Sequence, residues 1–99
     1  MKKSDLDKLV AIKRMVDLSI VDLQNIIDSS EKRLSVIEKR IDDYELKDNL
    51  TDTQEERLDK WQDEYDELED EIDQLTDIKT AFEDILCDLN FNYGVNSDN

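Results

Sequence analysis

Apolar residues recur along the first half of the chain at alternating intervals of three and four residues. Ten of the twelve positions in this series are apolar, and Lys13 and Ser30 are the exceptions. Such spacing places the side chains in one stripe along a helix, as in a coiled coil. We therefore expect a long amphipathic helix over residues of about 4–47. The positions are Leu6, Leu9, Lys13, Val16, Ile20, Leu23, Ile27, Ser30, Leu34, Ile37, Ile41 and Tyr44.

A second series with the same spacing runs through the other half of the chain. Ten of its eleven positions are apolar, and Lys79 is the exception. The pattern predicts a second long helix over residues of about 54–92. Its positions are Leu58, Trp61, Tyr65, Leu68, Ile72, Leu75, Lys79, Phe82, Leu86, Leu89 and Tyr93.

The segment between the two series, residues 47–56, reads KDNLTDTQEE and breaks the apolar spacing. Its Asp, Asn and Thr residues are typical of turns and helix starts. Either Thr51 with Gln54 or Thr53 with Glu56 fits a capping box, in which the two residues satisfy each other's free backbone N–H groups. We expect a turn over about 48–53. The fold class is then all-α, a long antiparallel helical hairpin resembling a coiled coil.

Other element boundaries are compatible with the same pattern. Tyr44 and Leu58 lie 14 residues apart, so one uninterrupted helix keeps the stripe in phase. A break at residues 28–30, where Asp28 and Glu31 mimic a capping box, gives three helices instead. The chain has one Gly and no Pro, and this favours long helices. Because that glycine, Gly94, suits a helix stop, we expect one domain over 1–94 and a disordered tail over 95–99.

Apolar residues also lie outside the two stripes. A two-helix hairpin buries little surface, and small cores supply only about 3–5 kcal/mol without further support. We therefore expect a homodimer that forms a four-helix bundle, although the same surface suits docking to a different protein. The expected interface residues are Ala11, Met15, Leu18, Val21, Ile78 and Ile85.

The chain has a strong negative charge that is concentrated in its second half. It holds 28 Asp and Glu against 13 Lys and Arg, a formal net charge of −15. Residues 42–99 contain twenty-one of the acidic residues and only four of the basic ones. This balance disfavours direct binding to nucleic acid or to an anionic membrane, and it favours a basic protein partner.

Six aspartates between residues 59 and 77 are spaced four and three residues apart, so they form one line on a helix, away from the apolar stripe. One interpretation is an anionic face presented to a cationic protein. The alternative is an ordinary solvated coiled-coil exterior, because aspartates outnumber glutamates 18 to 10 over the whole chain. The expected partner-binding residues are Asp59, Asp63, Glu64, Asp66, Glu67, Asp70, Glu71, Asp73 and Asp77.

In size and charge density the chain resembles small acidic helical proteins of phages and mobile elements that mimic DNA toward nucleases. The resemblance rests on residues 59–77 and on the overall charge balance. It implies inhibition of a nucleic-acid-binding protein by exclusion of its substrate. Three basic pairs, at residues 13–14, 32–33 and 39–40, depart from the uniform negative charge of such a decoy.

The residue inventory argues against catalysis. Histidine is absent, which removes the commonest general base and a frequent metal ligand. The 47–56 segment lacks the central Gly of a calcium-binding EF-hand loop, and the single cysteine permits no internal disulfide. We expect no catalytic residues, no metal and no cofactor. With no apolar run long enough to span a membrane, we expect a cytoplasmic protein.

The sequence therefore predicts a non-enzymatic regulator or inhibitor that offers an acidic helix face to a basic protein, such as a nuclease or another nucleic-acid-binding protein. The alternative is a structural or adaptor coiled coil that acts through homo-oligomerisation.

Overall fold

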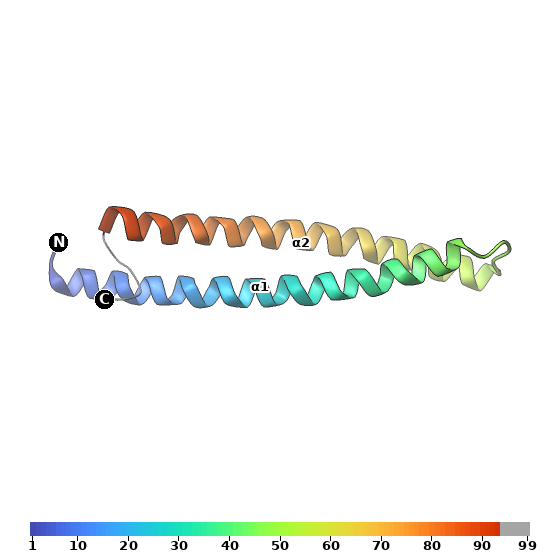
Figure 1. The fold of residues 1–99 in the computed structure, drawn as a ribbon, viewed down its shortest axis with the longest axis horizontal. Coiled ribbons are helices and arrows are strands. Elements are labelled where there is room, and N and C mark those ends of the chain that lie inside the picture. The colour runs from blue at the N-terminus through green and yellow to red at the C-terminus, as the bar shows by residue number, and fades with distance from the viewer. Residues whose placement is uncertain (94–99) are drawn as a thin grey trace. The chain divides into compact units, whose positions relative to one another are not determined.

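Two long helices make up most of the computed structural model, which describes residues 1–93. Helix α1 spans Lys3–Glu45, helix α2 spans Asp52–Tyr93, and residues 46–51 connect them (Figure 1). The predicted all-α helical hairpin is confirmed. The two alternatives are wrong, because a loop separates the helices and because α1 runs unbroken through residues 28–30. The expected tail over 95–99, together with Gly94, lies outside the described residues.

The start of α2 is fixed by a capping box, the first of the two that the sequence offered. The Thr51 N–H donates to Gln54 Oε1 at 3.0 Å, and the Gln54 N–H donates to Thr51 Oγ1 at 3.2 Å. The Glu55 N–H then donates to the Thr51 carbonyl at 2.9 Å, which is the first helical hydrogen bond. Because Thr51 is the cap, α2 begins two residues earlier than the expected position 54.

Backbone contacts divide the chain into two units, and each unit contains a part of both helices. Ile27–Gln74, which we call the loop unit, holds the end of α1, the connecting loop and the first half of α2. Residues 1–26 and 75–93, which we call the terminal unit, hold the beginning of α1 and the end of α2.

In the loop unit, α1 and α2 are held together by apolar and aromatic contacts along the predicted stripes. Ile37 is fully buried and Ile27 is nearly so. Nearer the loop, Tyr44 of α1 meets Trp61 of α2 edge to face, with ring centroids 4.7 Å apart and planes inclined by 66°. Aromatic pairs prefer this geometry because the positive edge of one ring meets the negative face of the other. The stripe residues therefore join the helices, as their spacing predicts.

The terminal unit buries two apolar side chains and a cation. Val16 and Leu89 are each 7% exposed, and Lys13 is 5% exposed. Lys13 Nζ lies 3.1 Å from Asp17 Oδ2, one helical turn further along α1. Its aliphatic stem thus packs in the stripe while its ammonium meets a carboxylate. Lys79, the other lysine in a stripe, bonds Glu83 in the same way at 3.4 Å.

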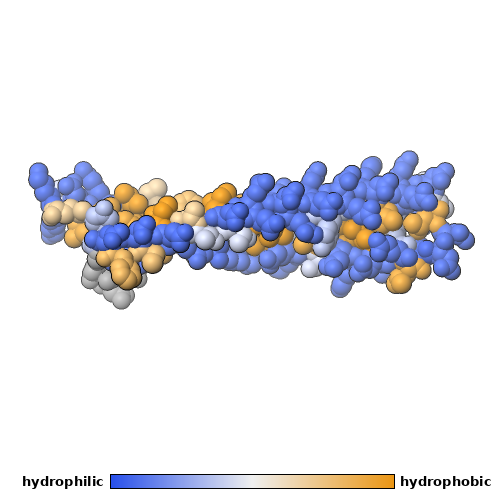
Figure 2. Space-filling model, turned by 90° about the horizontal axis from the view of Figure 1, so that it is seen from above, coloured by the Kyte–Doolittle hydropathy of each residue, from blue (hydrophilic) through white to orange (hydrophobic). Residues whose placement is uncertain are grey.

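Much apolar surface of the terminal unit faces solvent. Met15 and Leu18 are 67% and 66% exposed, although Val16 beside them is buried. Figure 2 shows hydrophobic surface gathered on the visible face of this unit. All six expected interface residues are exposed: Ala11, Met15, Leu18, Val21, Ile78 and Ile85. The expected dimer remains a prediction.

Candidate protein-interaction surface

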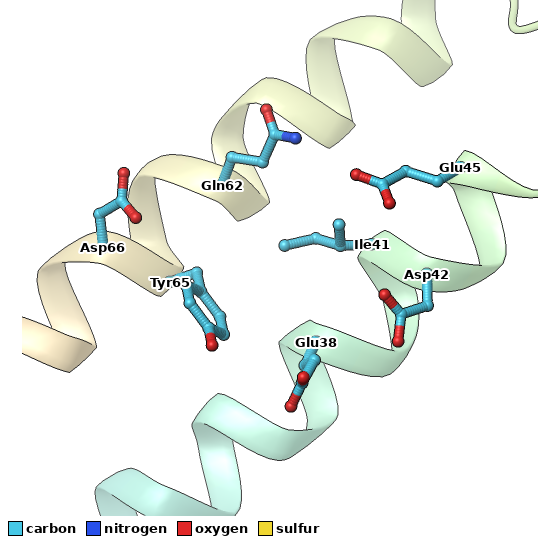
Figure 3. A pocket seen from close by; sticks show the side chains of 7 residues that line it. All are labelled: Glu38, Ile41, Asp42, Glu45, Gln62, Tyr65 and Asp66. Atoms are coloured by element: carbon cyan, nitrogen blue, oxygen red, sulfur yellow. The ribbon is translucent and has the colours of Figure 1, made fainter.

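An open groove lies between the two helices of the loop unit. It has a volume of about 260 Å³. Figure 3 shows Ile41 and Tyr65 extending between the helices, and carboxylates above and beside them. The lining residues come from both helices: Glu38, Ile41, Asp42 and Glu45 from α1, and Gln62, Tyr65 and Asp66 from α2. We call this the acidic groove.

Four carboxylates, one aliphatic side chain and one aromatic side chain decide the chemistry of the acidic groove. Within residues 1–93, no ion pair at 4.0 Å or less engages Glu38, Asp42, Glu45 or Asp66. Ile41 and Tyr65 supply an apolar surface among these charges. A cationic side chain with a long aliphatic stem matches both features, since its stem packs on apolar atoms while its charge meets the carboxylates.

Tyr65 reports the negative field at the groove. Its hydroxyl hydrogen-bonds the Glu69 carboxylate, and this bond, with the charge of Glu69, raises the pKa of Tyr65 above 10.0. Burial and the charges of Glu38 and Asp42 raise the pKa of Tyr65 further. All of these neighbouring charges disfavour the phenolate because it would be one more anion. Tyr65 is thus a neutral donor in an anionic setting.

The line of aspartates faces solvent. Five of its members lie in the loop unit and the sixth, Asp77, lies in the terminal unit. In the described part of the chain, no ion pair with Lys or Arg within 4.0 Å involves any of the six. The exposed aspartates are Asp59, Asp63, Asp66, Asp70, Asp73 and Asp77.

The glutamates of the predicted face differ among themselves. Glu67 and Glu71 are exposed, as the aspartates are. Glu64 is half-buried, and its Oε1 lies 3.0 Å from Arg33 Nη2 across the helix pair. Part of the charge of Glu64 is therefore neutralised by the protein's own arginine.

Several cations of the loop unit are occupied by its own side chains. Arg33 bonds Glu64, the Arg40 guanidinium lies 5.8 Å from the centre of the Trp61 ring, and Lys47 Nζ lies 4.5 Å from the centre of the Tyr44 ring. Cations are attracted to the faces of aromatic rings. Two of the basic pairs that depart from a uniform anionic surface, at 32–33 and 39–40, thus each contain an arginine held in a contact between the helices.

The division into units also separates the charge. The loop unit contains seven Lys and Arg and nineteen Asp and Glu, a net charge of −12. The described part of the terminal unit contains six Lys and Arg and eight Asp and Glu, a net charge of −2. The anionic field therefore belongs to the loop unit, while the terminal unit is nearly neutral.

Asp66 was predicted from the sequence as a binding residue, whereas the carboxylates that α1 contributes to the acidic groove were not. Glu38, Asp42 and Glu45 are spaced four and three residues apart, so they share one face of α1. This spacing was a usable signal. It did not show which residues of α2 would lie opposite them, because that depends on how the two helices pair.

Residues 1–93 contain no group of three or more Cys, Asp or Glu side chains arranged to hold a metal ion. Neither α1 nor α2 combines the length and apolar character of a membrane-crossing helix.

The chain matches no protein-family model, and comparison with curated proteins and with solved structures returns no significant match.

Proposed function

We propose that the chain is a non-enzymatic interaction protein whose loop unit binds a basic protein. The observation that carries this proposal is a set of exposed carboxylates that lack an ion pair within 4.0 Å and lie on both helices of that unit, along the acidic groove and the line of aspartates. They are Glu38, Asp42 and Glu45 on α1, and Asp59, Asp63, Asp66, Asp70 and Asp73 on α2. Because like charges on one surface repel each other, a cationic partner would relieve a cost that the free protein bears.

The charge density of α2 suits a partner protein that normally binds nucleic acid. Nine carboxylates lie between Asp59 and Asp73, a stretch of roughly 21 Å at the helical rise, or about one carboxylate per 2.3 Å. Duplex DNA carries about one phosphate per 1.7 Å and a single strand about one per 3.4 Å. A groove that binds phosphates therefore meets a comparable density of negative charge on this helix.

The acidic groove adds a specific contact to this general attraction. A lysine or arginine of the partner can lay its stem on Ile41 and Tyr65 and place its charge among the carboxylates. Charge alone governs the approach of the partner, whereas shape and desolvation in a groove govern how long it stays. The protein would then inhibit a nuclease, or another nucleic-acid-binding protein, by occupying its substrate channel.

The test compares two variants that change the net charge equally. The first replaces Asp63, Asp66, Asp70 and Asp73 with asparagine, and the control replaces Asp5, Asp7, Asp84 and Asp88, which are exposed in the terminal unit. A basic nucleic-acid-binding protein is first captured from the source cell, and its affinity for each variant is then measured at several salt concentrations. Duplex DNA is added as a competitor.

We expect the first variant to lose about tenfold or more in affinity, because four charges leave the contact surface, whereas the control stays close to wild type. The wild-type affinity should fall with salt, and DNA should displace the protein. Equal losses in both variants would mean that only the net charge matters. No loss in either variant would favour the alternative, a structural coiled coil.

A further inference from the structure

We propose that the terminal unit binds a second copy of this chain through the outer face of α1, with the two α1 helices antiparallel. The contact surface is the stripe formed by Lys8, Ala11, Met15, Leu18 and Asp22, which we call the outer stripe. Its members are spaced three and four residues apart, so they line up on the helix. The outer stripe lies in the terminal unit, whereas the acidic groove lies in the loop unit.

The outer stripe is opposite the buried stripe on the same helix. Lys13 and Val16 are buried, whereas Met15 and Leu18 are about two-thirds exposed. Ile12 and Ile26 flank the outer stripe and are each nearly half exposed. A helix that is apolar on two opposite faces needs a partner on both sides. Helix α2 covers only one of them in the single chain.

The charge of each unit indicates a second copy as the occupant. Two copies that met through their loop units would bring together two surfaces with a net charge of −12 each. The terminal unit has a net charge of only −2 over its described residues. It is therefore the part of this chain that a second copy can approach with little repulsion.

The ends of the outer stripe set the direction of pairing. Lys8 is at one end and Asp22 is at the other, with the apolar members between them. The Lys8 ammonium keeps much of its charge available, because its side chain is 78% exposed and its ion pair with Asp5 is 4.0 Å long. Antiparallel pairing brings Lys8 of each copy toward Asp22 of the other, whereas parallel pairing would place like charges together. A two-fold contact of this kind closes on itself and stops at a dimer.

The mass of the full-length protein in solution, measured by sedimentation equilibrium, tests the apolar part of the contact. We expect wild type to have twice the mass of one chain. Met15→Glu with Leu18→Glu should raise the dimer dissociation constant by about tenfold or more, because it would place charges in an apolar contact. Val36→Glu, at an exposed apolar position of the loop unit, is the matched control and should remain dimeric. Circular dichroism checks that all variants keep their helices.

A charge exchange tests the direction. Lys8→Asp alone and Asp22→Lys alone should each weaken the dimer, and the double variant should restore it, since each new aspartate again faces a lysine. A wild-type monomer at every concentration would overturn the proposal, as would dissociation by Val36→Glu alone. A double variant as weak as the single ones would exclude the antiparallel contact. None of these results bears on binding by the acidic groove, which is tested by substitutions in the loop unit.

Discussion

Arg33 and Glu64 form an ion pair that joins α1 to α2, with Arg33 Nε and Nη2 each 3.0 Å from Glu64 Oε1. The pairs Lys13–Asp17 and Lys79–Glu83 each lie within a single helix, so neither ion pair bridges α1 and α2. The Arg33–Glu64 contact therefore fixes the register of the loop unit at one point. It also removes a predicted partner-binding residue from the set of free carboxylates.

Truncation of this pair should have a small effect on stability. Both side chains are more than a third exposed, so we expect Arg33→Ala and Glu64→Ala each to lower the free energy of unfolding by about 0.2–1 kcal/mol. Urea unfolding of both single variants and the double variant gives their coupling energy, which should shrink as salt is added. Lys32→Ala, on the same turn, is the control. A coupling above about 2 kcal/mol would contradict a solvent-screened pair.

Ile37 should be the most sensitive aliphatic position of the loop unit. It is fully buried, whereas the adjacent Val36 is 43% exposed. Ile37→Ala is expected to lower the free energy of unfolding by about 2–5 kcal/mol, because it removes buried methyl groups and leaves a cavity. Val36→Ala should change it by about 0.5 kcal/mol or less. Thermal and urea unfolding followed by circular dichroism measures both. Similar losses at the two positions would place the core elsewhere.

Lys13 should be replaceable by an apolar residue without loss of stability. Its side chain is buried, and its ammonium is bonded to Asp17 at 3.1 Å. Lys13→Met keeps the stem and removes the desolvated charge, so we expect the free energy of unfolding to stay the same or rise by about 1 kcal/mol or more. Asp17→Asn should lower it by about 1–3 kcal/mol, since the buried ammonium loses its counter-charge. The opposite ranking of these two variants in urea unfolding would show that the lysine itself stabilises the fold.

The hydrogen bond between Tyr65 and Glu69 should make one part of the stability depend on alkaline pH. Because the bond raises the pKa of Tyr65 in the folded protein, its contribution is complete below the unfolded pKa near 10.0 and is lost as the pH rises through the folded pKa. Glu69→Gln should lower the pKa of Tyr65 toward its ordinary value, because it removes the charge that raises this pKa most. The tyrosinate ultraviolet signal measures this, with Tyr65→Phe to identify it.

Glu67→Gln is the control for that titration, because Glu67 does not contribute to the raised pKa of Tyr65. It removes the same charge from the same helix two residues away. If both glutamine variants moved the pKa of Tyr65 equally, the general field of α2 would be responsible rather than the hydrogen bond.

The spacing of apolar residues was sufficient to predict the hairpin, and the structure explains why. The stripes contain the buried Ile27, Ile37 and Leu89, and the break in the pattern coincides with a real loop. The capping box at Thr51 and Gln54 was also visible in the sequence, because its chemistry depends only on residues three positions apart. Features that are local, or that repeat along one helix, could thus be predicted.

The acidic groove was not predicted, because it depends on contacts between residues far apart in the chain. Asp42 and Asp66 line it together, although 24 residues separate them. Their proximity follows from the way α1 and α2 pair in the loop unit. The contacts of Arg33 with Glu64 and of Arg40 with Trp61 depend on the same pairing, since both partners belong to α2. Spacing along one helix contains no information about these contacts.

Trp61 is the one tryptophan of the chain, and it lies in the loop unit against Tyr44 and Arg40. Its fluorescence therefore reports local unfolding of the loop unit, because it changes when these neighbours separate. Far-ultraviolet circular dichroism instead follows the helical content of the whole molecule. Melting curves from the two signals that superimpose would identify a single cooperative transition. An earlier loss of ellipticity than of the tryptophan signal would mean that the terminal unit frays first.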